Sequence, residues 1–171
     1  EGIANTGLYV LNEKIFPLLE KVKRSERGEI ELTDAFTELC KTERVYLVNV
    51  ADYWLAVSYP WNLLEANVFF IRKLEKSDIK GTVEDNVSIK GNIILEEGAT
   101  IKSFSYIEGP IYIGKDTIIG PFANIRPDSI ILNNCNLGRC EVYDSLIMDR
   151  SVSKHFSYIG HSVFGEDVNV G

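Results

Sequence analysis

The sequence has few of the residues that most often carry redox or metal chemistry. Its 171 residues include two histidines, one methionine, two tryptophans and three cysteines. The cysteines are odd in number, and Cys40, Cys135 and Cys140 lack the spacing of a metal-ligand set. We therefore expect reduced, buried thiols in a cytoplasmic protein, and we assign no metal ligands.

Long apolar runs and an excess of positive charge are also missing. No stretch of about 18 apolar residues is present and no signal-peptide pattern is seen, so we expect no membrane span. Acidic residues outnumber basic ones by 25 to 18, which gives a net charge of −7. This acidity argues against binding to nucleic acid or to a membrane surface. Apolar residues make up 45% of the chain, enough for a sizeable core.

What the sequence does contain is a repeat with a period of six between residues 81 and 137. Every sixth position holds a branched aliphatic residue. These positions are Val83, Ile89, Leu95, Ile101, Ile107, Ile113, Ile119, Ile125, Ile131 and Leu137. A period of six fits neither an amphipathic helix nor an isolated strand. It is typical of a solenoid in which short parallel strands form triangular coils around buried aliphatic side chains.

A second set of positions follows the first by four residues. Its members from Val87 to Cys135 are small or apolar, and the pattern fails at Glu141. Glycines between the predicted strands supply the backbone freedom that tight corners need. A β-sandwich with irregularly spaced turns is the alternative, but the unbroken run of aliphatic positions favours a β-helix.

The residues before the repeat have a mixed helix and strand pattern. We expect strands at residues 8–11 and 45–50, because both runs are rich in apolar and β-branched residues. Asn12 is expected to cap a helix over residues 12–24, and Thr33 or Asp34 a second helix. A third helix is expected after Tyr59, with either a stripe through Leu64, Val68, Ile71 and Leu74 or one through Leu63, Phe70 and Leu74 buried.

These elements do not make an independent fold, because a sheet of only two or three strands would have edge strands without hydrogen-bonded neighbours. We therefore interpret residues 1–76 as the end of an α/β domain and residues 79–171 as the β-helix. The chain does not begin with Met, and it stops at Gly171 in the middle of a hexad. We expect a piece of a longer polypeptide, with the β-helix truncated at its C-terminal end.

Segments along nearly the whole chain, in their order and spacing, resemble one family. They are IANTGLYV, RGEIELTD, YPWNLLEAN, IEGPIYIG, IGPFANIRP and HFSYIG. Together they resemble the sugar-1-phosphate nucleotidylyltransferases that carry a C-terminal left-handed β-helix, some of which also acetylate an amino-sugar-1-phosphate. The resemblance implies a mainly β chain: a left-handed parallel β-helix of hexapeptide repeats, preceded by the C-terminal remnant of an α/β Rossmann-like nucleotidylyltransferase domain.

The resemblance implies nucleotidylyl transfer for the parent enzyme. A sugar-1-phosphate oxygen attacks the α-phosphorus of a nucleoside triphosphate, pyrophosphate leaves, and Mg²⁺ neutralises the phosphates. Asn5 matches a residue that contacts the sugar. The family's glycine-rich nucleotide loop is absent from this chain, and Ala56 stands where the family has a Mg²⁺-binding aspartate. The nucleotidylyl site is then impaired, unless a neighbouring carboxylate such as Asp52 substitutes.

The resemblance also implies acetyl transfer from acetyl-CoA at the β-helix. His155 matches a general base, and imidazole suits that role at neutral pH. The six-residue register slips between Gly138 and Tyr158, which predicts a loop leaving the coil and carrying this base. The resemblance further implies substrate binding by Arg126, Tyr158 and Asn169.

Two positions depart from the family pattern. Tyr143 stands in place of a phosphate-binding lysine, His161 stands in place of an aspartate, and one residue is missing just after Gly138. These departures keep a second hypothesis open, in which the β-helix is a non-catalytic module for trimerisation or regulation. A freestanding hexapeptide acyltransferase is disfavoured, because that class does not need residues 1–76. The expected partners are a sugar phosphate, a nucleoside triphosphate and two further copies of the chain in a homotrimer.

Overall fold

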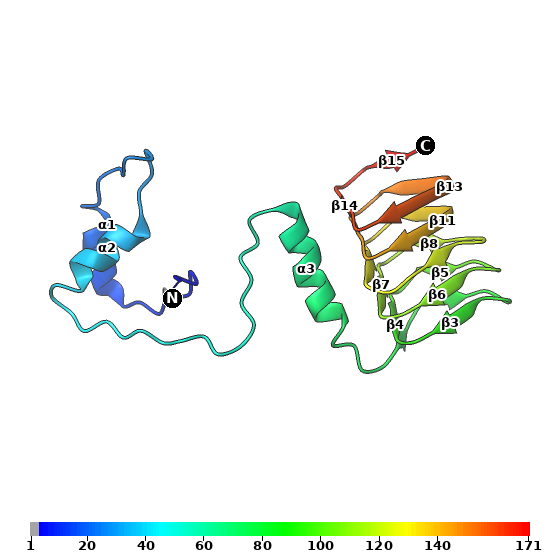
Figure 1. The fold of residues 1–171 in the computed structure, drawn as a ribbon, viewed down its shortest axis with the longest axis horizontal. Helices are drawn as coiled ribbons and strands as arrows, with labels where there is room; N and C mark the ends of the chain where they lie inside the picture. Colours follow the sequence, from blue (N-terminus) through cyan, green and yellow to red (C-terminus); the bar gives the residue numbers. More distant parts are fainter. Residues whose placement is uncertain (1–3) are drawn as a thin grey trace. The chain divides into compact units, whose positions relative to one another are not determined.

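The computed structural model describes residues 4–171, which fall into two compact units. The first unit ends at Trp54 and the second is Leu55–Gly171. Figure 1 shows the helices of the first unit and the stacked strands of the second. The expected division near residues 76–79, which rests on where the hexad repeat begins, stays a prediction. No helix within residues 4–171 has the length and apolarity needed to cross a bilayer.

The second unit is a parallel β-helix, as predicted from the period of six. Its strands pair with one another in parallel. One sheet contains, in spatial order, β1 (Asp78–Ile79), β4 (Ile93–Leu95), β7 (Ile111–Ile113), β10 (Ser129–Ile131), β12 (Leu146–Ile147) and β14 (Val163–Phe164). The other contains β2 (Thr82–Val83), β5 (Thr100–Ile101), β8 (Ile118–Ile119), β11 (Asn136–Tyr143), β9 (Asn124–Ile125), β6 (Tyr106–Glu108) and β3 (Ser88–Lys90), with β13 (Val152–Gly160) paired to β11 and to β15 (Asn169–Val170).

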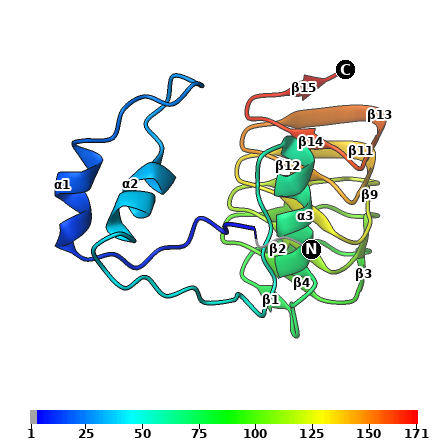
Figure 2. The same cartoon turned by 60° about the vertical axis from the view of Figure 1, so that its left-hand side comes forward.

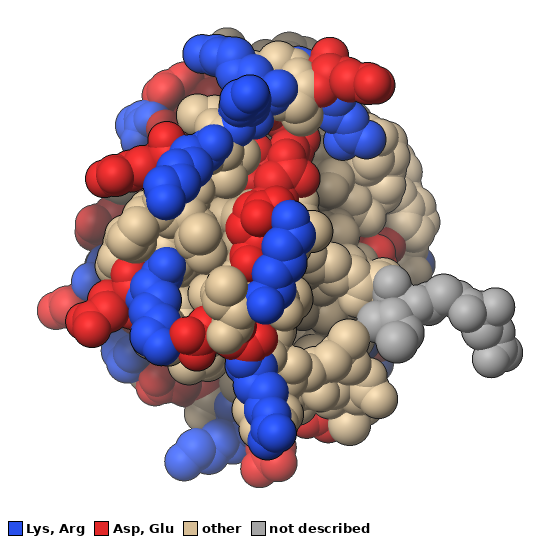
Figure 3. Space-filling model, turned by 90° about the vertical axis from the view of Figure 1, so that its left-hand side faces the viewer, with Lys and Arg blue, Asp and Glu red and all other residues tan. Residues whose placement is uncertain are grey.

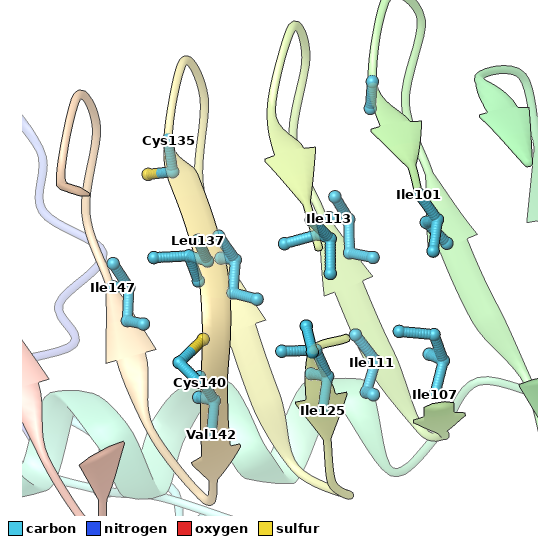
Figure 4. Packing of buried hydrophobic residues seen from close by; sticks show 14 of the residues in the cluster. Ile101, Ile107, Ile111, Ile113, Ile125, Cys135, Leu137, Cys140, Val142 and Ile147 are labelled. Carbon is cyan, nitrogen blue, oxygen red and sulfur yellow. The ribbon is translucent and has the colours of Figure 1, made fainter. Parts of the chain in front are cut away.

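The aliphatic positions of the hexads form the core of the coils. Ile101 pairs with Ile119 and Ile119 with Leu137, so each of these coils is 18 residues long. Their side chains are buried, with exposed fractions of at most 1%. Figure 4 shows Ile101, Ile113 and Leu137 projecting into the interior. Val83, in the first coil, is 37% exposed because only one neighbouring coil covers it.

The coils shorten after Leu137, at the point where the second set of positions fails. Ile125 pairs with Val142, one residue closer than the 18-residue spacing predicts, which confirms the missing residue after Gly138. Cys140 therefore points inward and is 5% exposed, while Glu141 faces outward. The predicted loop is wrong: β11 and β13 run as continuous strands of eight and nine residues through this region. Parallel pairing along both strands satisfies the backbone groups that a loop would have left to solvent.

Helix α3 (Pro60–Ile71) packs on one face of the β-helix, as Figures 1 and 2 both show. Leu64 and Ile71 are buried against Ile130 and Leu146. This confirms the first of the two predicted stripes, because Phe70 of the second stripe is 70% exposed.

A bidentate ion pair anchors the end of this helix. The guanidinium of Arg72 donates from Nε and Nη2 to the carboxylate of Asp128, at 3.0 and 2.7 Å. This hydrogen bonding raises the pKa of Arg72. The two parallel hydrogen bonds fix the direction in which the guanidinium meets the carboxylate, in addition to the attraction between the opposite charges.

The first unit has a small core between short helices. Its elements are the 3₁₀ helix η1 (Glu13–Ile15), α1 (Phe16–Leu19) and α2 (Leu32–Leu39). Ile15, Ala35 and Leu39 are buried together. On the face drawn in Figure 3, Lys and Arg side chains are interspersed with Asp and Glu side chains.

Several local predictions for this unit were wrong. Asn12 does cap the first helix, accepting from the backbone N–H of Lys14 at 3.1 Å, but that helix ends at Leu19 instead of residue 24. Helix α2 begins at Leu32, so Thr33 and Asp34 lie in its first turn and do not cap it. Cys40 follows the helix and is exposed, whereas Cys135 and Cys140 are buried as expected.

The predicted strands at residues 8–11 and 45–50 are absent, because both segments are irregular. Their β-branched and aromatic residues are largely exposed, with Val10 and Val48 among the most exposed. A strand needs a hydrogen-bonded neighbour, and neither segment pairs with another one. Local β-propensity without such a neighbour did not fix the conformation here.

Candidate functional site on the β-helix

Two of the predicted site residues, His155 and Tyr158, lie on β13, which pairs with β11 of the neighbouring coil. Arg139 pairs with His155, and Glu141 pairs with Tyr158. Between these pairs β13 carries one extra residue, Phe156, which has a positive φ of 49°. Such a bulge bends the strand and changes the direction of neighbouring side chains, and bulges are frequent near functional sites.

The bulge leaves both candidate side chains accessible. His155 is exposed, and Tyr158 is 62% exposed, whereas Ser153 and Ile159 on the same strand are buried. Within residues 4–171 the imidazole of His155 has no hydrogen-bond or ion-pair partner, so both ring nitrogens are open to a substrate. His155 is thus sterically free to act as a base.

Arg126 lies on the same outward face, held by two neighbours. Its Nη1 donates to Glu141 Oε1 at 2.9 Å, and its guanidinium carbon lies 4.3 Å from the centre of the Tyr143 ring. The hydrogen bond to Glu141 raises the pKa of Arg126. Arg126 is therefore well oriented, but a carboxylate already offsets its charge.

Tyr143 and His161, the two positions that depart from the family pattern, contact each other. Their ring centroids are 5.0 Å apart in an edge-to-face arrangement. His161 Nδ1 also lies 2.7 Å from Asp144 Oδ2. The two substitutions therefore belong to one local cluster, which continues through Tyr143 to Arg126.

A pocket of about 270 Å³ opens beside the β11–β13 pair. Its lining residues are Phe122, Arg139, Cys140, Glu141, Phe156, Ser157 and Tyr158. The guanidinium of Arg139 lies 5.5 Å from the ring centres of both Phe122 and Phe156. Our sequence reasoning missed Arg139. The available signal was its position directly after Gly138, where the register changes.

Comparison with known proteins gives a consistent result. Residues 1–73 match the nucleotidyl transferase family. The chain is 46% identical over 171 residues to a bifunctional sugar-1-phosphate nucleotidylyltransferase/acetyltransferase of Sulfurisphaera tokodaii, covering 99% of this chain and 43% of that protein. It is also 46% identical to the bifunctional protein GlmU of Methanocaldococcus jannaschii, covering 99% of this chain and 42% of that protein.

The chain is related over its whole length to bifunctional sugar-1-phosphate nucleotidylyltransferase/acetyltransferases. It spans less than half the length of these relatives. Among solved structures, a point mutant of perosamine N-acetyltransferase from Caulobacter crescentus, in complex with CoA and GDP-perosamine, aligns with a TM-score of 0.43 at 14% identity, covering 55% of this chain and 50% of that one. A likeness this distant does not bear on function.

The residues matched to the bifunctional family do not all lie together. His155 and Tyr158 lie together on β13, whereas Arg126 lies two coils away and is linked to them through Glu141 on β11. Asn169 lies on β15, paired with Val152 at the start of β13, and is exposed. Their roles in binding and catalysis stay predictions.

Asn5 belongs to the first unit and lines a cleft there. Its side-chain oxygen accepts from the backbone N–H of Gly7 at 2.9 Å, and its amide donates to the hydroxyl of Tyr9. The cleft has a volume of about 910 Å³ and includes Trp54. Asn5 is therefore both a turn residue and a cleft residue, and its contact with a sugar stays a prediction.

The Mg²⁺ ion that the bifunctional family implies does not fit the residues present. In the described part of the chain, no group of three or more His, Cys, Asp or Glu residues could hold a metal ion. Ala56 offers no donor at the position matched to a metal-binding aspartate, and Asp52 is exposed. We derive no metal-dependent step from these residues.

Proposed function

We propose that this chain is part of a bifunctional enzyme that makes nucleotide sugars, and that its β-helix acetylates an amino-sugar-1-phosphate. One observation carries the proposal: His155 and Tyr158 are exposed on β13, and Glu141 on the intervening strand β11 pairs with Tyr158 and binds Arg126. The identity to bifunctional relatives along the whole chain supports the same reaction. The acetyl donor is acetyl-CoA.

In the proposed reaction His155 acts as the general base. Its imidazole takes a proton from the sugar amine, while the lone pair of the amine nitrogen forms a bond to the carbonyl carbon of the thioester. The carbon–sulfur bond then breaks, the electron pair leaves on sulfur, and the sulfur gains a proton to become the free thiol of CoA. The products are an N-acetylamino-sugar phosphate and CoA.

The remaining matched residues bind the acceptor sugar. The guanidinium fork of Arg126 suits a phosphate, although a phosphate must compete with Glu141 for it. Tyr158 offers a hydroxyl and an exposed ring beside His155, and Asn169 offers an amide. These three contacts orient the amine toward the base.

The first unit belongs to the other proposed activity, in which a sugar-1-phosphate and a nucleoside triphosphate give a nucleotide sugar and pyrophosphate. Asn5 is the residue of this chain that we assign to sugar binding there. We also propose that the β-helix assembles as a homotrimer, with acetyl-CoA bound between neighbouring protomers. Size measurement in solution tests the trimer independently of activity.

The deciding experiment is an acetyl-transfer assay on the full-length protein. Acetyl-CoA and glucosamine-1-phosphate are mixed with enzyme, and release of free thiol is followed. His155→Ala is the test variant, and Asn12→Ala, at a helix cap in the first unit, is the control. Release by the parent and the control but not by His155→Ala supports the proposal.

The opposite result is equally informative. Absence of thiol release from the parent protein, with nucleotidyl transfer still measurable, contradicts acetyl transfer at the β-helix. The β-helix would then serve assembly, and the remainder of the enzyme would carry the chemistry.

A further inference from the structure

The arginines of the second unit differ in how their charges are compensated. Arg72 is paired with Asp128 and Arg126 with Glu141. Arg150 is paired with Asp167 and Glu166, and this raises its pKa and lowers that of Asp167.

Arg139 is different from these three. In the described portion of the second unit it is the arginine without a carboxylate partner, because its contacts are with aromatic rings.

The aromatic contacts fix Arg139 without using its hydrogen-bond donors. The ring centres of Phe122 and Phe156 each lie 5.5 Å from the guanidinium carbon of Arg139. Phe122 is itself stacked on Phe104, with centroids 5.3 Å apart and planes 10° from parallel. A guanidinium held by ring faces keeps its N–H groups free, which is the state that binds a phosphate in bidentate fashion.

The location of Arg139 links it to the proposed reaction. It pairs in register with His155 and lines the 270 Å³ pocket together with Tyr158. Lys154 lies beside it, opposite Gly138, where an added Cβ would come within 3.1 Å of the Lys154 Cα. Lys154 is exposed and has no ion-pair partner in residues 4–171. Two cations without a carboxylate partner therefore occupy positions next to His155, one preceding it on β13 and one opposite it on β11.

The charges at the other end of the same face are already balanced. Tyr143 brings no charge where the family pattern has a lysine. Arg126 is offset by Glu141, and Asp144 adds a further negative charge beside His161. A dianionic group would meet a less favourable field there than near Arg139.

We infer that Arg139 binds a phosphate group of a substrate at the β-helix site, and that Lys154 adds to its field. This rests on the proposed acetyl transfer for its functional meaning. The phosphate has two possible sources with the same chemistry: the 1-phosphate of the acceptor sugar, or the phosphates of acetyl-CoA. The arrangement moves anion recognition from the lysine position of the family to the strand that pairs with the base.

The test uses full-length protein and the variants Arg139→Gln and Arg139→Lys. Arg150→Gln is the matched control, since it removes an arginine that is paired elsewhere on the β-helix. Thermal unfolding checks that each variant is folded. Values of KM for glucosamine-1-phosphate and for acetyl-CoA are measured by thiol release.

Loss of a charge-assisted contact to phosphate should raise one KM about tenfold or more in Arg139→Gln, with partial recovery in Arg139→Lys. A rise for glucosamine-1-phosphate alone identifies the acceptor phosphate, and a rise for acetyl-CoA alone identifies the CoA phosphates. If neither KM differs from that of the Arg150→Gln control, the inference is overturned.

A separate binding measurement keeps this inference distinct from the proposed function. Calorimetric titration with glucosamine-1-phosphate, glucosamine and CoA requires no turnover. If the parent enzyme releases no thiol but binds a phosphate-bearing probe in a way that Arg139→Gln loses, acetyl transfer is refuted and the Arg139 site is retained. Equal binding by parent and variant, or no binding by the parent, refutes the site.

Discussion

Tyr143 and His161 meet edge to face, with ring planes at 80° and centroids 5.0 Å apart. The family resemblance assigns a lysine and an aspartate to these positions, which are residues of opposite charge. In this chain an aromatic pair occupies both positions. The Oδ2 atom of Asp144 lies 2.7 Å from Nδ1 of His161. The two departures are therefore one coupled change in the site, in which contact between rings stands where two charges are expected.

The coupling between these rings can be measured with a double-mutant cycle. Tyr143→Ala, His161→Ala and the double variant are compared with the parent in chemical denaturation. We expect a coupling free energy of about 1 kcal/mol, because each single change removes the same edge-to-face contact. Effects that add within about 0.3 kcal/mol would show that the two rings are energetically independent.

Removing the charge of Glu141 should strengthen anion binding at Arg126. Glu141→Gln keeps the size of the side chain but no longer offsets the guanidinium 2.9 Å away. We expect the KM for glucosamine-1-phosphate to fall about threefold or more, since a charged partner is replaced by a neutral one. The control is Glu108→Gln, which changes the same residue type on β6. A KM that rises in Glu141→Gln alone would mean that Glu141 contacts the acceptor.

A charge placed on the inner side of a coil should unfold the β-helix. Ile119 is 0% exposed, so Ile119→Asp would bury a carboxylate without a partner and should cost roughly 4 kcal/mol or more. Ile118→Asp is the matched control, because the neighbouring side chain is only half-buried and turns the other way. Equal melting temperatures for the two variants would show that the hexad phase is wrong.

The three cysteines should differ sharply in reactivity. Cys40 is exposed, whereas burial raises the pKa of Cys135 and raises that of Cys140 to about 12. Because the thiolate is the reactive form, iodoacetamide at pH 8 should label Cys40 and leave the other two thiols free. Mass spectrometry of the labelled protein checks this, and labelling in denaturant provides the fully reactive reference.

The raised pKa of Cys140 also predicts a loss of stability in alkaline solution. Its folded pKa of about 12 lies above the ordinary thiol value of 9.0. The neutral thiol is therefore favoured by folding, and its contribution is complete below pH 9 and is lost as pH rises through 12. Cys140→Ala should be less stable at pH 7 but should show a shallower decline from pH 9 to 11. An identical decline in parent and variant would assign the alkaline loss to other groups.

The hexad pattern predicted the β-helix because each hexad repeats one local arrangement that every coil uses. The failure of the pattern at Glu141 was visible in the sequence, but its outcome was not. Only the strand pairing shows that the chain shortens by one residue so that Cys140 turns inward and Glu141 outward. The hexad period indicates which side chains are buried only as long as no residue is missing from a coil. Beyond such a point, the pairing of neighbouring coils determines which side chains face inward.

Residues 45–50 and Arg139 show why other features could not be predicted. The β-branched residues of that segment favour a strand, but a ladder depends on a neighbour that the local sequence does not specify. Arg139 is recognisable only when Phe122 and Phe156, 17 residues away on each side, meet its guanidinium. Contacts between successive coils are long-range in sequence, so a local motif does not show them.

The bulge at Phe156 lets β13 accommodate one residue more than β11 in the same stretch of pairing. In an unbroken strand, residues three apart face opposite sides, so His155 and Tyr158 would be divided between solvent and core. The bulge takes Phe156 out of the ladder, so His155 and Tyr158 pair with Arg139 and Glu141, which are two residues apart on β11, and both face solvent. The exposed face of β13 is therefore kept because one position absorbs a residue for which the neighbouring coil has no partner.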